Sequence, residues 1–232
     1  APGLKAMVDD LAGAGRGLIM VMGKGGVGKT TVAAAIAVGL VKRGLQVHLT
    51  TTDPAAHVAF VVDGTLPGLI VDRIDPVAET ARYVEKIMDT KGRNLDQADR
   101  ALMREDLASP CTEEVAVFHA FSRIVSEARS AFVVLDTAPT GHTLLLLDAT
   151  GAYHREIARQ MTESGLHFTT PMMQLQDEAR TKVLIATLAE NTPVQEAALL
   201  QEDLRRAGIE VARRRVAGGA AGADDVEVVA GA

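Results

Sequence analysis

The sequence predicts an α/β fold in which a mostly parallel, doubly wound sheet carries helices on both faces. Two observations lead to this prediction. Short apolar stretches typical of buried strands alternate with longer helical stretches, an order that gives parallel strands joined by crossover helices. The first strand also runs directly into a glycine-rich turn and a helix, as in sheets that bind ligands at the carboxyl ends of their strands. The expected strands are residues 18–22, 46–51, 69–74, 131–135 and 183–188.

The first strand, turn and helix carry a phosphate-binding pattern. The strand is followed by the turn Gly-Lys-Gly-Gly-Val-Gly-Lys-Thr at residues 23–30, and a helix is expected from about Lys29 to just before Gly44. The turn matches the P-loop pattern G-x-x-x-x-G-K-[ST] in both sequence and context, so the fold class is expected to be that of a P-loop NTPase. The expected nucleotide-binding residues are Gly23, Lys24, Gly25, Gly26, Val27, Gly28, Lys29, Thr30 and Thr31.

The turn suits a triphosphate for physical reasons. Glycines let the backbone curl so that its N–H groups point inward and cradle an anion. The N-terminus of the following helix adds roughly half a positive charge behind the phosphates. Lys29 is long enough to reach the β- and γ-phosphates, and the Thr30 hydroxyl is a ligand for Mg²⁺. ATP and Mg²⁺ are therefore the expected cofactors.

Two other interpretations of the turn explain less. Gly23, Gly25 and Gly28 also spell the dinucleotide pattern G-x-G-x-x-G, with Asp53 in the place of a ribose-binding acid. That interpretation gives the Lys-Thr pair no role and ignores Asp136. A glycine turn that only joins a strand to a helix would not need the pair either, so the P-loop interpretation is preferred.

Aspartates at two strand ends complete the expected site. Asp53 follows the second strand in Thr-Thr-Asp-Pro, and Asp136 ends the apolar strand Phe-Val-Val-Leu-Asp. Either one alone is an ordinary turn or capping residue, but parallel strands bring both to the sheet edge that carries Lys29. Asp136 is expected to hold Mg²⁺ through water, and Asp53 to orient the attacking water or support Mg²⁺. The expected magnesium residues are Thr30, Asp53 and Asp136, and the expected catalytic residues are Lys24, Lys29, Asp53 and Asp136.

The expected ATPase domain covers residues 17–210 and is flanked and interrupted by other segments. Residues 1–16 are rich in Gly and Ala and are expected to form a linker or a frayed helix. A helical insertion is expected at about residues 76–130, and within it Ser109 should cap a helix that has Pro110 at its first position. Thr192 should open another helix through a capping box, and that helix should stop at Gly208.

Composition narrows the class of protein. The chain of 232 residues is 47% apolar but only 3% aromatic, with no Trp, so its core is built from aliphatic side chains. The net charge of −6 argues against a nucleic-acid partner. The longest apolar stretch, Val32–Val41, is about half of what a membrane span needs, so no direct membrane insertion is expected. A single cysteine excludes an internal disulfide and fits a cytoplasmic protein. The lack of an initial Met suggests a piece of a longer protein.

Several motifs together resemble one ATPase family. Lys24 makes the turn a deviant P-loop, as in a group of dimerising ATPases. Residues 52–57 (TDPAAH), 109–114 (SPCTEE) and 136–143 (DTAPTGHT) add three more motifs. In combination the chain is similar to the ArsA family of arsenical pump-driving ATPases, most of all to the family's second nucleotide-binding half, from about residue 1 to Glu210. Residues 1–16 resemble the linker between the halves.

The resemblance implies an ATPase that couples ATP hydrolysis to arsenite or antimonite efflux through an integral-membrane partner. Such a protein would be cytoplasmic and peripherally attached to the inner membrane by that partner. Lys24 would be the signature lysine, which acts across the interface on a second ATPase half or a homodimer partner; its simpler interpretation is a solvated surface lysine.

The resemblance also assigns a metalloid site to Ser109, Cys111 and His142. Soft As(III) or Sb(III) prefers thiolates, and this chain has one. The other thiols would have to come from another half or a partner. Without the resemblance, a lone cysteine is more simply an inert apolar residue.

After Glu210 the resemblance ends. The family continues with an apolar strand ending in an Asn pair that helps to recognise adenine, whereas residues 211–232 contain only Ala, Gly, Val, Arg, Asp and Glu. We hypothesise a C-terminal truncation or an out-of-frame tail that is disordered. The adenine pocket would then be incomplete and an apolar sheet edge would lie open.

Two rival functions stay open. A homodimeric targeting ATPase for tail-anchored membrane proteins shares the P-loop and both aspartate motifs. It would favour a paired-cysteine zinc site, absent here, and a methionine-rich groove, of which Met161, Met172 and Met173 are the only candidates. Core packing is their simpler interpretation. The third function is a truncated nucleotide-binding fragment without turnover.

Overall fold

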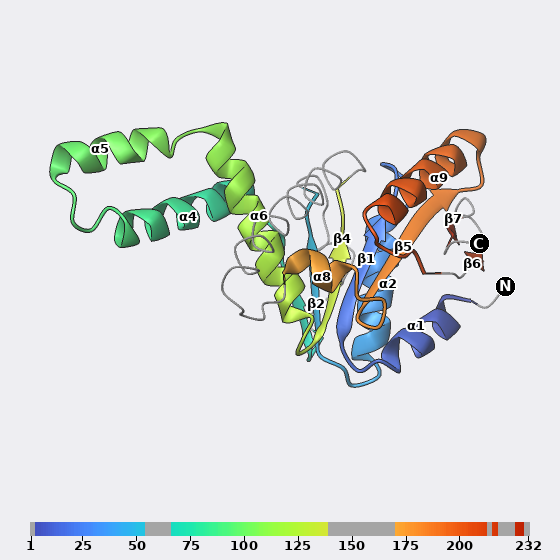
Figure 1. The fold of residues 1–232 in the computed structure, drawn as a ribbon. Coiled ribbons are helices and arrows are strands. Elements are labelled where there is room, and N and C mark those ends of the chain that lie inside the picture. The colour runs from blue at the N-terminus through green and yellow to red at the C-terminus, as the bar shows by residue number, and fades with distance from the viewer. Residues whose placement is uncertain (1–2, 54–65, 139–169, 213–214, 218–225, 230–232) are drawn as a thin grey trace, which may run out of the picture.

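The computed structural model describes residues 3–53, 66–138, 170–212, 215–217 and 226–229. Its strands form one sheet in the order β3-β2-β4-β1-β5-β7-β6 (Figure 1). The parallel strands are β1 (Gly17–Met22), β2 (Val47–Thr51), β3 (Leu69–Val71), β4 (Phe132–Asp136) and β5 (Thr181–Leu188). The helices are α1 (Leu4–Ala12), α2 (Lys29–Val41), α4 (Pro76–Thr90), α5 (Gln97–Asp106), α6 (Pro110–Glu127), α8 (Pro171–Leu175) and α9 (Asn191–Arg206). The predicted doubly wound α/β fold is confirmed.

Strand register brings the expected acids to one edge of the sheet. Asp136 is paired with Val21 of β1 on one side and with Thr51 of β2 on the other. Since these strands are parallel, the carboxyl ends of β1, β2 and β4 lie together, next to the start of α2. The third strand is shorter than expected: it ends at Val71, although the Asp72 and Ile74 amides still bond to carbonyls of β2.

Helices α1 and α2 cover one face of the sheet. The residues of β1, β2 and β4 that point to this face include Val21, Leu49 and Val134, all fully buried. They pack against Ile36, Leu40 and other apolar residues of α2. Helix α2 is therefore sandwiched between the sheet and α1, which explains why it is apolar on nearly all sides.

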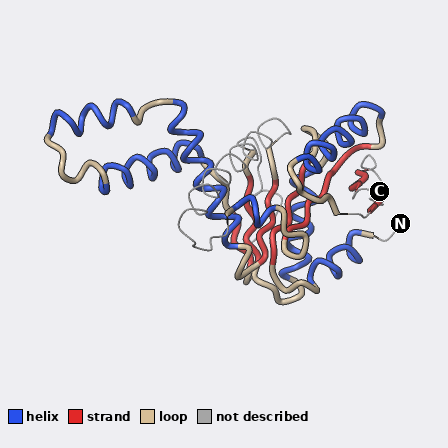
Figure 2. Tube along the Cα trace, viewed as in Figure 1, coloured by secondary structure: helices blue, strands red, loops and turns tan. Residues whose placement is uncertain are grey.

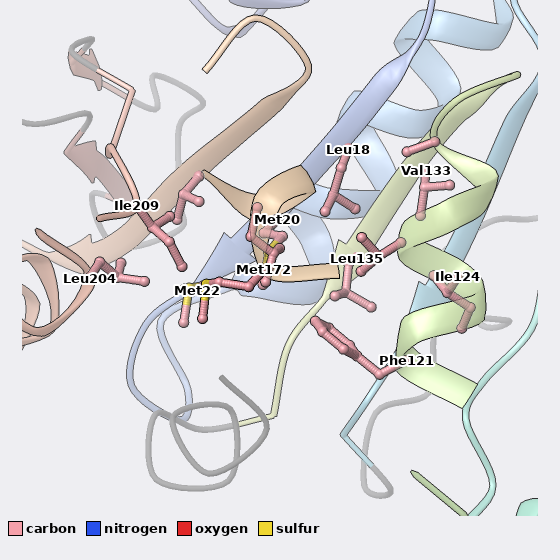
Figure 3. Close-up of a cluster of buried hydrophobic side chains, with 14 of the residues drawn as sticks. Leu18, Met20, Met22, Phe121, Ile124, Val133, Leu135, Met172, Leu204 and Ile209 are labelled. Carbon is pink, nitrogen blue, oxygen red and sulfur yellow. The ribbon is translucent and has the colours of Figure 1, made fainter. Parts of the chain in front are cut away.

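Helices α6, α8 and α9 cover the opposite face, which takes the alternate residues of the same strands (Figure 3). Met20 and Leu135 from the sheet meet Phe121 of α6 and Met172 of α8 there. Met172 is therefore a core residue, as its simpler interpretation has it, whereas Met173 is exposed and Met161 lies outside the described residues. Removing a buried ring such as that of Phe121 would cost about 3–5 kcal/mol.

Helices α4 and α5 extend away from the sheet as an arm rooted on α6 (Figure 2). They occupy the range expected for a helical insertion. Only Met88 of α4 is buried, and α5 buries no residue. The arm therefore gains little from apolar burial within the described part of the chain.

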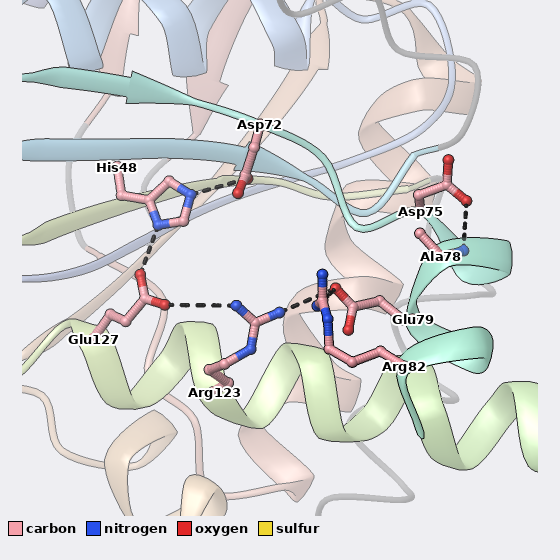
Figure 4. A network of polar contacts seen from close by, with 8 residues as sticks. All are labelled: His48, Asp72, Asp75, Ala78, Glu79, Arg82, Arg123 and Glu127. Atoms are coloured by element: carbon pink, nitrogen blue, oxygen red, sulfur yellow. Dashed lines mark hydrogen bonds and ion pairs between the residues drawn. The ribbon is translucent and has the colours of Figure 1, made fainter. Parts of the chain in front are cut away.

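A polar network attaches the arm to the sheet (Figure 4). His48 of β2 lies between two carboxylates, with Nδ1 2.7 Å from Glu127 Oε2 and Nε2 2.9 Å from Asp72 Oδ1. Arg123 of α6 lies 4.0 Å from Glu127 and donates to Glu79 of α4 at 3.0 Å. Charged side chains thus connect β2 to α6, and α6 to α4.

The segment expected as a linker or frayed helix instead contains α1, packed against α2. Met7 and Val8 are both 3% exposed and join the core on that face. Gly39 of α2 allows this close approach, because a Cβ there would lie 2.9 Å from Val8 Cγ1. Arg43 also donates to the Asp9 carboxylate. The prediction relied on the Gly/Ala-rich composition and overlooked apolar residues at helical spacing.

The segment expected to be disordered contains two short strands among its described residues. β7 (Val226–Val229) pairs antiparallel with β5, and β6 (Arg215–Ala217) pairs antiparallel with β7. An apolar sheet edge was expected to lie open, whereas in the structure β7 covers the edge of β5 from Ile185 to Leu188. The valines of this segment have the β-branched side chains that favour strands.

The two expected helix caps have different outcomes. Ser109 caps α6 as expected, and its Oγ accepts a hydrogen bond from the Thr112 amide. The capping box at Thr192 is wrong, since α9 begins earlier and its N-cap is Glu190, without a side-chain capping bond. No helix within the described ranges is both long and apolar enough to cross a bilayer.

Candidate nucleotide-binding site

Glycines shape the turn between β1 and α2. Gly23 has φ 141° and lies so close to β5 that an added Cβ would collide with the Ala186 carbonyl oxygen. Gly28 is the N-cap of α2 in a left-handed conformation, φ 85°. Side chains are strained in both conformations, so these two positions require glycine. Gly25 and Gly26 face open space, as a backbone that must approach a ligand would, and Gly26 is also left-handed, with φ 81°.

Lys29, in the first turn of α2, curls back over this loop. Its Nζ donates to the Lys24 carbonyl oxygen at 2.9 Å, and the residue is only 6% exposed. Burial lowers the pKa of its ammonium, whereas the negative charges of Asp136 and Asp53 raise it. Both aspartates therefore act on Lys29, as expected from their strand ends.

Asp136 is the buried centre of the site. Its Oδ2 accepts hydrogen bonds from the Thr30 hydroxyl at 2.7 Å and the Thr51 hydroxyl at 3.3 Å. Its Oδ1 is buried without a hydrogen-bond partner among the described residues. Burial raises the pKa of this carboxyl, and the Thr30 hydrogen bond lowers it. A buried carboxylate oxygen with no donor is a position where a cation or its water would be stabilising.

Asp53 is tied to the site through the backbone. Its amide donates to the Thr51 hydroxyl at 3.0 Å. On the neighbouring residue, the Thr52 hydroxyl accepts from the Ala138 amide at 2.8 Å, and the Thr52 amide bonds to the Asp136 carbonyl. Hydrogen bonds thereby join the two chain segments that leave β2 and β4 at the point where they start.

Lys24 forms an ion pair within its own chain in this structure. Its Nζ lies 2.9 Å from Glu196 Oε1 of α9, and both side chains are partly exposed, at 44% and 38%. The residue is therefore on the surface beside the loop, where a cation is accessible to a second molecule.

Together these groups fit a phosphate chain and Mg²⁺. The loop combines a curled backbone at a helix N-terminus with the Lys29 ammonium. It ends at Thr30, whose hydroxyl is hydrogen-bonded to the buried Asp136 carboxylate. Anionic phosphates would compensate the buried ammonium, and a divalent cation would compensate the orphaned Oδ1.

The family follows from comparison with known proteins. Residues 16–166 match the anion-transporting ATPase family. The chain belongs to this family. It is 66% identical over 206 residues to an arsenical pump-driving ATPase of Escherichia coli, covering 89% of this chain and 35% of the relative.

Two further relatives extend the comparison. An arsenical pump-driving ATPase of Acidiphilium multivorum is 66% identical over 206 residues, 89% of this chain and 35% of that protein. A putative arsenical pump-driving ATPase of Halobacterium salinarum is 33% identical over 211 residues, 82% of this chain and 33% of that protein. The chain thus spans about a third of the length of these curated relatives.

The residues expected to bind a metalloid are only partly described in this anion-transporting ATPase chain. Ser109 and the exposed Cys111 lie at the start of α6. His142 lies outside the described residues. Within the described part, no three His, Cys, Asp or Glu side chains gather as a metal site.

Three residues of the site were not expected. Thr51 and Thr52 contribute hydroxyls to the contacts around Asp136 and Ala138, and Glu196 holds Lys24. The threonines had a local signal, because two hydroxyl residues directly precede a strand-end acid. Glu196 had none, being 172 positions from Lys24.

Proposed function

We propose that the chain is a nucleotide-binding unit of an arsenical pump ATPase, which hydrolyses ATP with Mg²⁺ and drives arsenite or antimonite efflux through a membrane partner. One observation carries the proposal most: Thr30 and Lys29, adjacent on α2, converge with Asp136 at the edge of the sheet. The family and the 66% identical arsenical pump-driving relatives support the coupling to metalloid efflux.

Each group has a role that follows from its charge and position. The Lys29 ammonium would neutralise charge on the β- and γ-phosphates. The Thr30 hydroxyl and Asp136 would hold Mg²⁺, which supplies further charge neutralisation at the transferred phosphoryl group. Asp53, whose charge acts on Lys29, would orient the attacking water by accepting a hydrogen bond from it.

Lys24 would act in trans. Its position on the surface beside the loop suits a cation that reaches the phosphates of a second ATPase unit, as an arginine finger does. That unit would be a second half of the same protein or a second copy. Lys24 would have to leave Glu196 in order to reach those phosphates.

The metalloid would bind where α6 begins. Cys111 is exposed there and Ser109 adjoins it, and one thiolate is too few for a soft trivalent ion. The remaining ligands would come from His142 and from cysteines of a second ATPase unit. Metalloid binding would thus favour pairing of the two units.

The test is ATP hydrolysis with and without antimonite, for the wild-type chain and the Lys29→Ala and Cys111→Ser variants. Stimulation by antimonite that Cys111→Ser removes, together with loss of hydrolysis in Lys29→Ala, is the expected result. Hydrolysis that ignores antimonite would instead favour the targeting ATPase. Nucleotide binding without hydrolysis would favour the inactive fragment.

A further inference from the structure

Thr51 occupies an unusual place for a strand residue. It ends β2, is paired in register with Asp136 of β4, and is 1% exposed. The neighbouring residue Thr50 is just as buried but points to the other face of the sheet, and its hydroxyl has no hydrogen-bond partner among the described residues. The chain thus places two buried threonines in succession, and only one of them contacts the site.

The Thr51 hydroxyl makes two bonds of opposite sense. It donates to Asp136 Oδ2 at 3.3 Å and accepts from the Asp53 amide at 3.0 Å. An ionised carboxylate can only accept and an amide N–H can only donate, so these roles are fixed. A hydroxyl can serve both at once, and a valine of the same shape can serve neither.

Strand packing does not account for this hydroxyl. Valine has the same branched shape and at least as high a preference for strands, and a buried hydroxyl is costly unless it is hydrogen-bonded. Asp136 Oδ2 is otherwise held, among the described residues, by Thr30. Once the Thr30 hydroxyl turns towards a cation, Thr51 is the described group that keeps this carboxylate oriented.

We propose that Thr51 is a positioning residue, whose hydroxyl fixes the Asp136 carboxylate and the start of the Asp53 segment relative to each other so that both acids address one phosphate site. This inference rests on the proposed function, since the two acids need a common orientation only if they serve one reaction. It adds a coupling between the two acid-bearing segments, made by a side chain that itself touches no phosphate.

The test compares Thr51→Val with Thr51→Ser, and uses Thr50→Val as the matched control on the same strand. Two readouts are measured on each chain: steady-state ATP hydrolysis as a function of Mg²⁺ and ATP, and amide hydrogen exchange of the segment containing Asp53 without nucleotide. Thr51→Ala replaces Thr51→Val if the latter does not fold, as judged by circular dichroism.

Thr51→Val should lower kcat or raise the half-saturating Mg²⁺ concentration by about tenfold or more, with the KM for ATP changed much less. It should also speed exchange of the Asp53 amide by about fivefold, the effect of one lost hydrogen bond. Thr51→Ser should restore most of both values, and Thr50→Val should stay within about twofold of the wild type.

Two results would overturn the proposal: Thr51→Val behaving like Thr50→Val in both readouts, or Thr51→Ser being as impaired as Thr51→Val. The exchange readout separates this inference from the proposed function. If the wild-type chain binds no ATP, the proposed function is wrong, and unchanged exchange at Asp53 would then refute the role of Thr51 independently.

Discussion

Lys24 of the loop and Glu196 of α9 form an ion pair with 2.9 Å between Nζ and Oε1, although 172 positions separate them in sequence. The pair holds within one chain the cation that we propose acts on a second ATPase unit. Because both side chains are partly exposed, the pair is worth less than about 1 kcal/mol, which is weak enough to be exchanged for a phosphate contact.

Glu196→Gln should therefore raise ATP hydrolysis by about two- to fivefold at limiting protein concentration, because Lys24 no longer has to leave a carboxylate. Lys24→Ala should abolish this gain in the double variant. The measurement is the hydrolysis rate against protein concentration for the three variants. A loss of activity in Glu196→Gln as deep as that in Lys24→Ala would show that Glu196 has a direct role instead.

Asp136→Asn should stabilise the nucleotide-free chain while it removes Mg²⁺-dependent hydrolysis. Burial raises the pKa of this carboxyl, so its charged form opposes folding at pH 7, and Oδ1 has no donor among the described residues. We expect a melting temperature higher by about 2–4 °C. Asp106→Asn, on the exposed end of α5, is the control and should change neither property. A lower melting temperature for Asp136→Asn would contradict this account of the charge.

His48 should make stability depend on pH. The Asp72 carboxylate, 2.9 Å from Nε2, is the main cause that raises the pKa of His48, and the Glu127 carboxylate acts in the same direction (Figure 4). A raised pKa means that the folded state binds the proton more tightly than the unfolded state. The contribution of protonated His48 to the free energy of unfolding is therefore complete below the ordinary pKa of about 6.5. It is lost as pH rises through the higher pKa of the folded state.

The measurement is urea unfolding of the wild type and His48→Gln between pH 6 and pH 9. The wild type should lose about 1 kcal/mol more than the variant over this range. Equal pH dependence in the two proteins would mean that the imidazole does not bridge Asp72 and Glu127 as an imidazolium.

Helix α1 should contribute to the stability of the domain. Val8→Ala removes a side chain that packs against Gly39 and is expected to lower the free energy of unfolding by about 1–3 kcal/mol. Lys5→Ala, on the exposed face of the same helix, should change it by less than about 0.5 kcal/mol. Identical unfolding curves for the two variants would restore the interpretation of residues 1–16 as a linker.

The sequence was most informative where its chemistry is local. The turn from Gly23 to Thr30 needs glycine geometry and a lysine at fixed spacing, and β4 is an apolar strand that ends in Asp136. Both patterns predict element and position together, since parallel strands must bring their carboxyl ends to one edge. The same holds for Ser109, whose hydroxyl serves the amide three residues on.

Features that depend on distant contacts were less accessible. The apolar face of α1 looked like a Gly/Ala-rich linker, because its partner is a glycine on another helix. The Val-containing end of the chain was taken as disordered, because nothing local identifies β5 as its partner strand. Glu196 and the His48 network are pairings of surface or buried charges between elements, which a single sequence does not specify.

The central claim is that the loop from Gly23 to Thr30 binds the triphosphate of ATP with Mg²⁺, and calorimetric titration tests it most directly. The wild-type chain and Lys42→Ala, at the exposed C-terminal end of α2, should bind ATP with Mg²⁺ equally well. Lys29→Ala should bind at least about 30-fold more weakly, because a buried ammonium no longer meets the phosphates. Equal affinity in all three, or no binding by the wild type, would contradict the account.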